Sequence, residues 1–317
     1  MRQRNEREKL QRLAEQNEYR SWADYGTCAS SHELLEPYIA SYTYSVGSVK
    51  EQEAKFITRA YPTVMTQLYF EFCGDISEVK DSRGEFAFGN CANHTNNAID
   101  KRTYIKQGLG SWFDIYQLPS QRNSRPIKNL KVDLYPNTLY QLFQLSPQEL
   151  AAEDLQLADL IGATTSSLML EEMEAAITGK ELVEIVDRYF LNYLQHVDTR
   201  RIQCLQAVPQ LPTIDETLSN QAQHYNKSER WLQKCYAKVY GMSFKQIQNN
   251  LKFHQVHQVL TQALGKSQPI NLTELAYHFG YFDQAHFIKD FRRYAGMTPG
   301  QYLRTHVDAD SQYLFYW

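Results

Sequence analysis

The feature that most constrains the fold is an internal repeat in the last third of the chain. The segments 228–247 and 283–302 align at a constant offset of 55 residues. Upstream of them, 218–226 matches 272–280 at an offset of 54, so the turn in the second copy is one residue longer. The pairs that match are Leu232 and Phe287, Tyr236 and Phe291, Val239 and Tyr294, Gly241 and Gly296, and Met242 and Met297. A repeat of this length predicts two similar helical units that share one domain.

Each copy has the signals of two helices joined by a tight turn. In the second copy, Asn271 and Glu274 have the spacing of a capping box at the start of a short helix. Gly280 supplies a left-handed turn residue, and Asn226 is suited to the same role in the first copy. Ser228 and Asp283 are good N-caps for the helices that follow. We therefore expect two helix-turn-helix units.

The stretch between the copies, SFKQIQNNLKFHQVHQVLTQALGK, predicts one long helix. About 20 residues at 1.5 Å each span roughly 30 Å. One turn of B-DNA is about 34 Å. Two helices held this far apart fit successive major grooves on one side of a duplex.

The segment LAYHFGYFDQAHFIKDFRRYAGMTPGQYLR carries a family resemblance. With it, residues 213–306 resemble the DNA-binding domain of AraC/XylS-type regulators, on the positions Ala276, Gly280, Phe287, Phe291, Gly296, Pro299 and Tyr302. The first copy departs from the family pattern at Asn226 and at Phe244, which stands where the second copy has Pro299. The resemblance implies a transcription regulator that binds double-stranded DNA, commonly an activator that also contacts RNA polymerase.

The resemblance also implies which side chains meet DNA. The expected base-reading residues are Arg230, Gln233, Lys234, Gln284, His286 and Lys289. Arg and Lys can donate to guanine, and Gln can pair with adenine. The expected phosphate contacts are Lys238, Arg292 and Arg293, which position the protein without reading sequence. For any one of these residues, a solvated surface position is nearly as good an interpretation, but for the whole set it is a poor one.

The rest of the chain predicts an α+β protein. Residues 1–24 have a polar helical pattern, and from about residue 34 to 132 short aromatic and β-branched runs alternate with turn residues, which predicts strands. Helical patterns follow, as in ELVEIVDRYFLNYLQHV. We expect a strand-rich effector-binding or oligomerisation domain with trailing helices at 1–205, a linker at 206–212, the all-α DNA-binding domain at 213–306 and an aromatic tail at 307–317.

With the segment LKVDLYPNTLYQLFQLSPQELAAEDLQLADLIG, the N-terminal half also resembles the strand-rich sensory domains of this family. The resemblance implies an effector-binding or oligomerising role, and so a small-molecule effector or a homodimer. Aromatic side chains in the predicted strands could line a pocket, although a place in the core is the more common role; these are Tyr69, Phe72, Trp112 and Tyr116. The sequence pattern assigns no ligand-binding residue.

Charge divides unevenly between the C-terminal third of the chain and the rest. Residues 213–317 hold 11 Lys and Arg against 8 Asp and Glu, whereas residues 1–212 hold 22 against 28. A mildly basic C-terminal segment permits nucleic-acid binding. The chain has no long apolar run and a charged N-terminus, so we expect a cytoplasmic protein without a membrane partner.

Two alternatives remain open. One is an enzymatic or metal-sensing domain fused to the DNA-binding module, but no nucleophile, phosphate-binding or zinc-protease motif occurs. The five cysteines form no CxxC, and Cys73, Cys91 and His94 make a poor metal site because their spacing is uneven. We therefore expect no catalytic residue, no metal and no cofactor. The other is a regulator controlled by a protein partner. The tail DSQYLFYW motivates it, and we expect this tail to dock on the N-terminal domain or on a second subunit.

Overall fold

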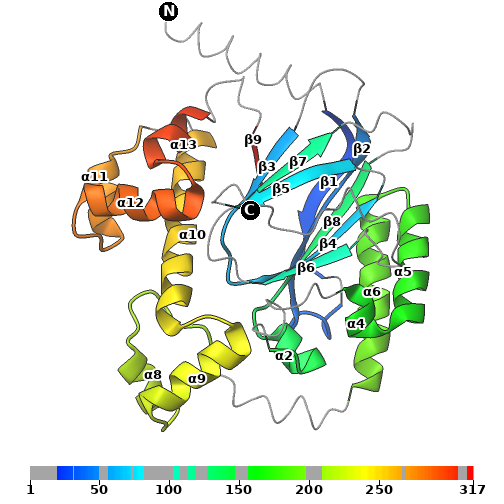
Figure 1. The fold of residues 1–317 in the computed structure, drawn as a ribbon, viewed down its shortest axis with the longest axis horizontal. Coiled ribbons are helices and arrows are strands. Elements are labelled where there is room, and N and C mark those ends of the chain that lie inside the picture. The colour runs from blue at the N-terminus through cyan, green and yellow to red at the C-terminus, as the bar shows by residue number, and fades with distance from the viewer. Residues whose placement is uncertain are drawn as a thin grey trace, which may run out of the picture.

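The computed structural model describes residues 20–30, 32–49, 56–72, 75–81, 103–107, 113–118, 127–146, 156–197, 209–265, 269–305 and 313–316. Its strand-rich part contains β1 (Arg20–Cys28), β2 (Ile39–Val49), β3 (Phe56–Ala60), β4 (Thr66–Phe72), β5 (Asp75–Asp81), β6 (Thr103–Gln107), β7 (Phe113–Leu118) and β8 (Ile127–Leu134). Two sheets form, with a layer of helices outside one of them (Figure 1). The expected α+β class is confirmed. The prediction of a helix up to residue 24 is wrong at its end, because residues 20–24 belong to strand β1. Residues 1–19, where the rest of that helix was expected, lie outside the described residues.

The five-stranded sheet has the order β1-β2-β8-β4-β6, and all its neighbours are antiparallel. Because side chains alternate along a strand, its two faces differ. On β4, Leu68, Phe70 and Phe72 are buried in the main core, whereas Gln67 and Tyr69 point to the other side. The sheet therefore has one apolar face and one polar face.

Helices cover the apolar face. After the short α2 (Thr138–Phe143), α4 (Leu157–Ile161), α5 (Ala163–Ala175) and α6 (Gly179–His196) pack there (Figure 1). Helix α6 starts with a capping box between Thr178 and Glu181. The buried Lys128 on β8 donates to the carbonyl oxygens of Met173, Glu174 and Ala176, so it caps the end of α5.

The second sheet has the order β5-β7-β3-β9, and its last strand comes from the C-terminal tail. Strand β9 (Tyr313–Tyr316) pairs in parallel with β3 from Ile57 to Ala60. The prediction that the tail docks on the N-terminal domain is thus confirmed. It docks by adding a strand beside β3, so the C-terminal tail and the N-terminal domain share one sheet.

The C-terminal part is all helical. It consists of α8 (Leu218–His224), α9 (Glu229–Tyr240), α10 (Phe244–Gly265), α11 (Leu272–His278), α12 (Gln284–Ala295) and α13 (Pro299–Thr305). Helix α10 runs along the side of the strand-rich part, with α8 and α9 at one end and α11 to α13 at the other (Figure 1). The expected long connecting helix between the two units is confirmed.

The loop between β3 and β4 joins the two parts. Tyr61 is buried against Phe253 and His257 of α10, with ring centroids 5.8 and 4.5 Å away. Three residues on, Val64 is buried in the core of the first helical unit with Val239. One short loop of the N-terminal domain therefore contributes to the cores of both repeat units.

The segment expected as a linker is described only from Pro209 onward. There the carbonyl oxygens of Pro209 and Gln210 accept hydrogen bonds from the hydroxyls of Tyr240 and Tyr236. Leu211 packs on the core of the first unit. Residues 209–212 thus belong structurally to the first helical unit rather than to a free connection.

Candidate DNA-binding site

The two repeat units have matching turns. In the first, Asn226 adopts a left-handed conformation with φ 51°, and Gly280 does so in the second with φ 65°. The next helix is capped in each case, as Ser228 accepts from the backbone N–H of Trp231 and Asp283 from that of His286. Each helix ends at a left-handed glycine, Gly241 or Gly296. The expected N-caps Ser228 and Asp283 and the expected left-handed turn residues are therefore confirmed.

Packing fixes which faces of α9 and α12 point outward. On α12, Phe287, Phe291 and Tyr294 are almost completely buried around Phe253 of α10. On α9, the buried residues are Leu232, Tyr236, Val239 and Tyr240, while Cys235 is only partly buried. Each helix shares its apolar stripe with α10 and presents its other face to solvent.

All nine residues expected to contact DNA lie on α9 or α12. Eight of them are exposed and Gln284 is half-buried. Gln284, His286 and Lys289 occupy the first half of α12, and Arg292 and Arg293 occupy its last turn. The N-terminal residues of a recognition helix contact base edges in helix-turn-helix proteins. The division into base-reading and phosphate-binding side chains stays a prediction.

Gln284 is held in place by the preceding helix. Its side-chain oxygen accepts a hydrogen bond of 3.0 Å from the Thr273 hydroxyl on α11. With that oxygen engaged, the NH₂ group remains to donate to a base. A donor of this kind suits the acceptor atoms of guanine, thymine or adenine N7.

Lys238 lies differently from the other predicted phosphate contacts. Its amino nitrogen is 5.2 Å from the centre of the Tyr140 ring on α2, and its backbone oxygen accepts a hydrogen bond from Ser146. The residue therefore sits where the first unit meets the N-terminal domain. Sequence alone did not indicate this contact, because Lys238 is 92 residues from Ser146 and still farther from Tyr140 along the chain.

One exposed aromatic residue was not expected at the site. Phe282, directly before the N-cap of α12, is 85 % exposed. It is the most exposed of the large apolar side chains that the structure describes. The signal in the sequence was the additional residue in the second turn.

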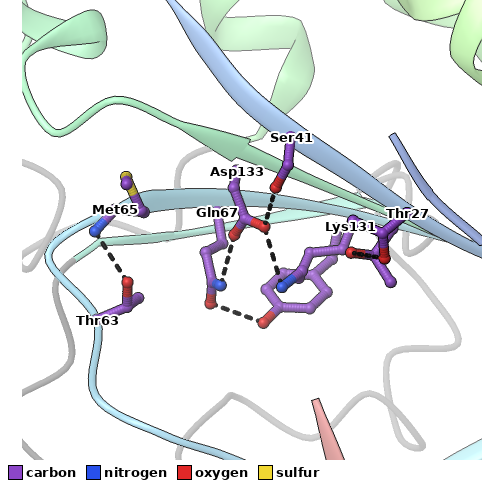
Figure 2. Close-up of polar contacts among 9 residues, drawn as sticks. Thr27, Ser41, Thr63, Met65, Gln67, Lys131 and Asp133 are labelled. Atoms are coloured by element: carbon purple, nitrogen blue, oxygen red, sulfur yellow. Dashed lines mark hydrogen bonds and ion pairs between the residues drawn. The ribbon is translucent and has the colours of Figure 1, made fainter. Parts of the chain in front are cut away.

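A pocket of about 540 Å³ lies between the polar face of the five-stranded sheet and α10. On the sheet side, the Asp133 carboxylate accepts hydrogen bonds from Ser41 and Gln67 and forms an ion pair of 3.0 Å with Lys131 (Figure 2). The helix side contributes His254, His257, Gln258, Thr261 and Gln262. Its volume is that of a typical small-molecule site.

The aromatic residues considered earlier divide between the pocket and the core. Tyr69 lines the pocket and donates to Gln67, whereas Phe72 is buried in the main core. Of Tyr116 only the backbone is described, and Trp112 lies outside the described residues. The sequence could not separate these cases, because aromatic residues occur on both faces of a strand.

His254 sits deep on the helix side of the pocket. Burial lowers the pKa of this histidine, and a hydrogen bond to the backbone of Pro62 opposes that shift. The positive charge of Lys131 lowers the pKa further, while Asp133 raises it. The balance favours the neutral imidazole, and the Lys131–Asp133 pair has no net charge, so the pocket wall is close to neutral overall.

In the described part of the chain, no three His, Cys, Asp or Glu side chains lie close enough together to hold a metal ion. Cys28 and Cys235 are free thiols there, and burial raises the pKa of each. Cys73, Cys91 and His94 lie outside the described residues. Within the same described ranges, no helix combines the length and the hydropathy that crossing a membrane requires.

The repeat matches a known sequence family. Residues 221–305 match the sequence family described as helix-turn-helix domain. No curated protein matches the sequence.

Among solved structures, ToxT from Vibrio cholerae is 10 % identical, with 83 % of this chain and 97 % of that chain covered and a TM-score of 0.38. ToxT of strain SCE256 with a bound unsaturated fatty acid is also 10 % identical, with 83 % and 94 % covered and a TM-score of 0.36. The C-terminal domain of AraT, a response regulator from Geobacillus stearothermophilus, is 25 % identical over 32 % of this chain and 78 % of that one, with a TM-score of 0.26. These TM-scores are too low to support a conclusion about this chain. The identification of the DNA-binding domain therefore rests on the family match and on the geometry of the two units. Residues 221–305 of the chain form an AraC-type helix-turn-helix domain, a DNA-binding module.

Proposed function

We propose that the protein binds a specific DNA sequence by placing α9 and α12 in successive major grooves. The observation that carries this proposal is the length of α10, which has 22 residues and joins two matching units. At 1.5 Å per residue it spans about 33 Å, close to the 34 Å turn of B-DNA. Each unit would then read one block of bases on the same side of the duplex.

The experiment that tests the proposal is selection of bound duplexes from random DNA by the purified full-length protein, at about 0.15 M salt because affinity falls steeply with salt. We expect an enriched motif with two blocks about 10 base pairs apart, centre to centre. A single enriched block would contradict simultaneous reading by both helices. No enrichment at all would contradict sequence-specific binding.

We further propose that a small-molecule effector controls DNA binding from the pocket between the sheet and α10. The supporting observation is that the pocket touches both the N-terminal domain and the helix that spaces the two units. A ligand there could favour one orientation of α10 only by binding that orientation more tightly. Because the pocket wall is close to neutral, an uncharged ligand fits it better than a carboxylate does.

The effector proposal predicts which compounds stabilise the protein. We expect uncharged alcohols, sugars or amides to raise the melting temperature more than carboxylates of matched size. The substitution Thr43→Tyr, at the pocket wall, should reduce this effect because the larger ring fills the space. Thermal unfolding in the presence of each compound measures it. Stronger stabilisation by the carboxylates, or an unchanged effect in the variant, would contradict this proposal.

The resemblance to AraC/XylS-type regulators supports activation through RNA polymerase and a homodimer as the working form. A promoter carrying the selected motif, transcribed with purified RNA polymerase, tests activation. We expect more transcript when the protein is added. A lower yield would instead make the protein a repressor, and sedimentation of the protein–DNA complex measures the number of copies bound.

A further inference from the structure

The turns of the two units differ by one residue, and the hydrogen bonds identify it. The backbone N–H of Lys227 donates to the carbonyl of Ala222, and in the second unit the N–H of Tyr281 donates to that of Ala276. These bonds mark equivalent positions. After them, the first unit passes directly to its N-cap, whereas the second inserts Phe282 before Asp283. Phe282 therefore has no counterpart in the first unit.

Both neighbours of Phe282 are anchored, so its side chain has no route into the core. Tyr281 is buried, donates to Asp290 at 3.0 Å and lies 5.3 Å from the ring of Phe287. Asp283 is fixed as the N-cap by a 2.7 Å bond from the backbone N–H of His286. The anchored turn holds the phenyl ring outward at 85 % exposure. Exposing so large an apolar surface is unfavourable in the free protein.

The position of Phe282 points to DNA as its partner. It lies at the end of α12 that carries Gln284 and His286, and the N-terminal residues of a recognition helix are those that reach base edges. The major groove offers one apolar feature to a phenyl ring, the methyl group of thymine. We propose that Phe282 contacts a thymine methyl next to the bases read by Gln284 and His286. This inference rests on the proposed function and adds a specificity-determining residue to it.

Deoxyuridine gives a sharp test, because it lacks only the methyl group and keeps the hydrogen-bonding atoms of thymine. Once the selection has defined the operator, each thymine in the block read by the second unit is replaced in turn. We expect the wild-type protein to bind about threefold to tenfold more weakly at one position. Phe282→Ala should bind the unmodified operator more weakly by a similar factor and should be insensitive to the replacement there.

Two variants serve as controls. Phe282→Leu keeps an apolar side chain and should retain part of the preference for thymine. Tyr277→Ala removes the other strongly exposed aromatic side chain of this unit, which is 61 % exposed on α11. It should keep the full sensitivity to deoxyuridine. Because Phe282 and Tyr277 are both exposed, these substitutions leave the core intact.

Three results would overturn the inference. One is equal sensitivity to deoxyuridine in wild type and Phe282→Ala, since the ring would then not contact the methyl group. Another is an operator block without a preferred thymine. The last is normal DNA binding by Phe282→Ala with reduced transcription, which would assign the ring to a protein partner. Each of these leaves sequence-specific binding by the wild type intact, so it differs from failure of the proposed function, in which no sequence is enriched.

Discussion

At the scale of single residues, His254, which lines the pocket, makes the stability of the protein depend on pH. Its folded-state pKa is lowered mainly by burial, so the unfolded chain binds a proton more readily than the folded protein does. The neutral His254 side chain therefore contributes its full stabilisation above the pKa of the unfolded chain, about 6.5, and this contribution is lost as the pH falls below that pKa. The groups facing His254 are Pro62, Lys131 and Asp133.

We therefore expect the free energy of unfolding to fall between pH 7.5 and 5.5, with His254 contributing a slope of about 1.4 kcal/mol per pH unit at most. His254→Gln removes this titrating group and should flatten the curve. Urea unfolding at several pH values gives the comparison. The other histidines are the same in both proteins, so identical slopes would show that His254 does not contribute.

Single substitutions also distinguish the predicted base-reading residues from the predicted phosphate contacts. Lys289→Ala should cost roughly 1–3 kcal/mol on the selected operator and relax the preference at one base pair. Arg293→Ala, in the last turn of the same helix, should weaken binding to all sequences about equally and lower the salt slope by about one. Binding to operator and to random DNA over a range of salt concentrations measures both. Equal losses for the two variants on both DNAs would contradict the division.

At the scale of elements, α10 controls how the two units are placed. Inserting one alanine after the exposed Gln255 would rotate one unit by about 100° against the other and move it by 1.5 Å. We expect affinity for the two-block operator to fall about tenfold or more, because both helices can no longer enter their grooves together. Single-block DNA should be bound as before.

Gln255→Ala is the matched control for this insertion, because it adds no residue to the helix. It should bind the two-block operator like the wild type. The insertion also disturbs the packing of Tyr61 between Phe253 and His257, so thermal unfolding must show that the variant is still folded. A folded insertion variant with unchanged affinity for the two-block operator would show that the spacing of the units does not matter.

At the scale of the whole molecule, strand β9 connects the DNA-binding part to the N-terminal domain. It pairs with β3 over four residues, so removing residues 311–317 deletes a strand from the edge of the second sheet. We expect the deletion to lower stability by about 1–3 kcal/mol through lost backbone hydrogen bonds. Calorimetry of the full-length and truncated proteins measures the loss.

A point substitution separates the pairing from the length of the tail. Leu314→Pro removes a backbone donor within β9, whereas Leu314→Thr keeps a residue that is common in strands. The proline variant should behave like the deletion and the threonine variant like the wild type. Unchanged stability in all three variants would show that the pairing contributes nothing.

The sequence by itself determined the C-terminal domain in considerable detail. The repeat, the caps at Ser228 and Asp283 and the left-handed turn residues are local signals, and the structure has helices with those ends. The helical period of 3.6 residues also predicts which charged residues point outward, because burying Phe287 and Phe291 leaves the opposite face of α12 exposed. Short aromatic and β-branched runs between turn residues predicted the strand-rich domain in the same local way.

Only the tertiary structure decided how the parts meet. Tyr61 contacts His257 nearly 200 residues away along the chain, and Lys238 lies against Tyr140. The pocket and the pairing of β9 with β3 depend on contacts of the same kind. A hydrophobic period shows that a face will be covered but does not identify what covers it. That choice depends on the shape and polarity of surfaces that exist only once the chain has folded.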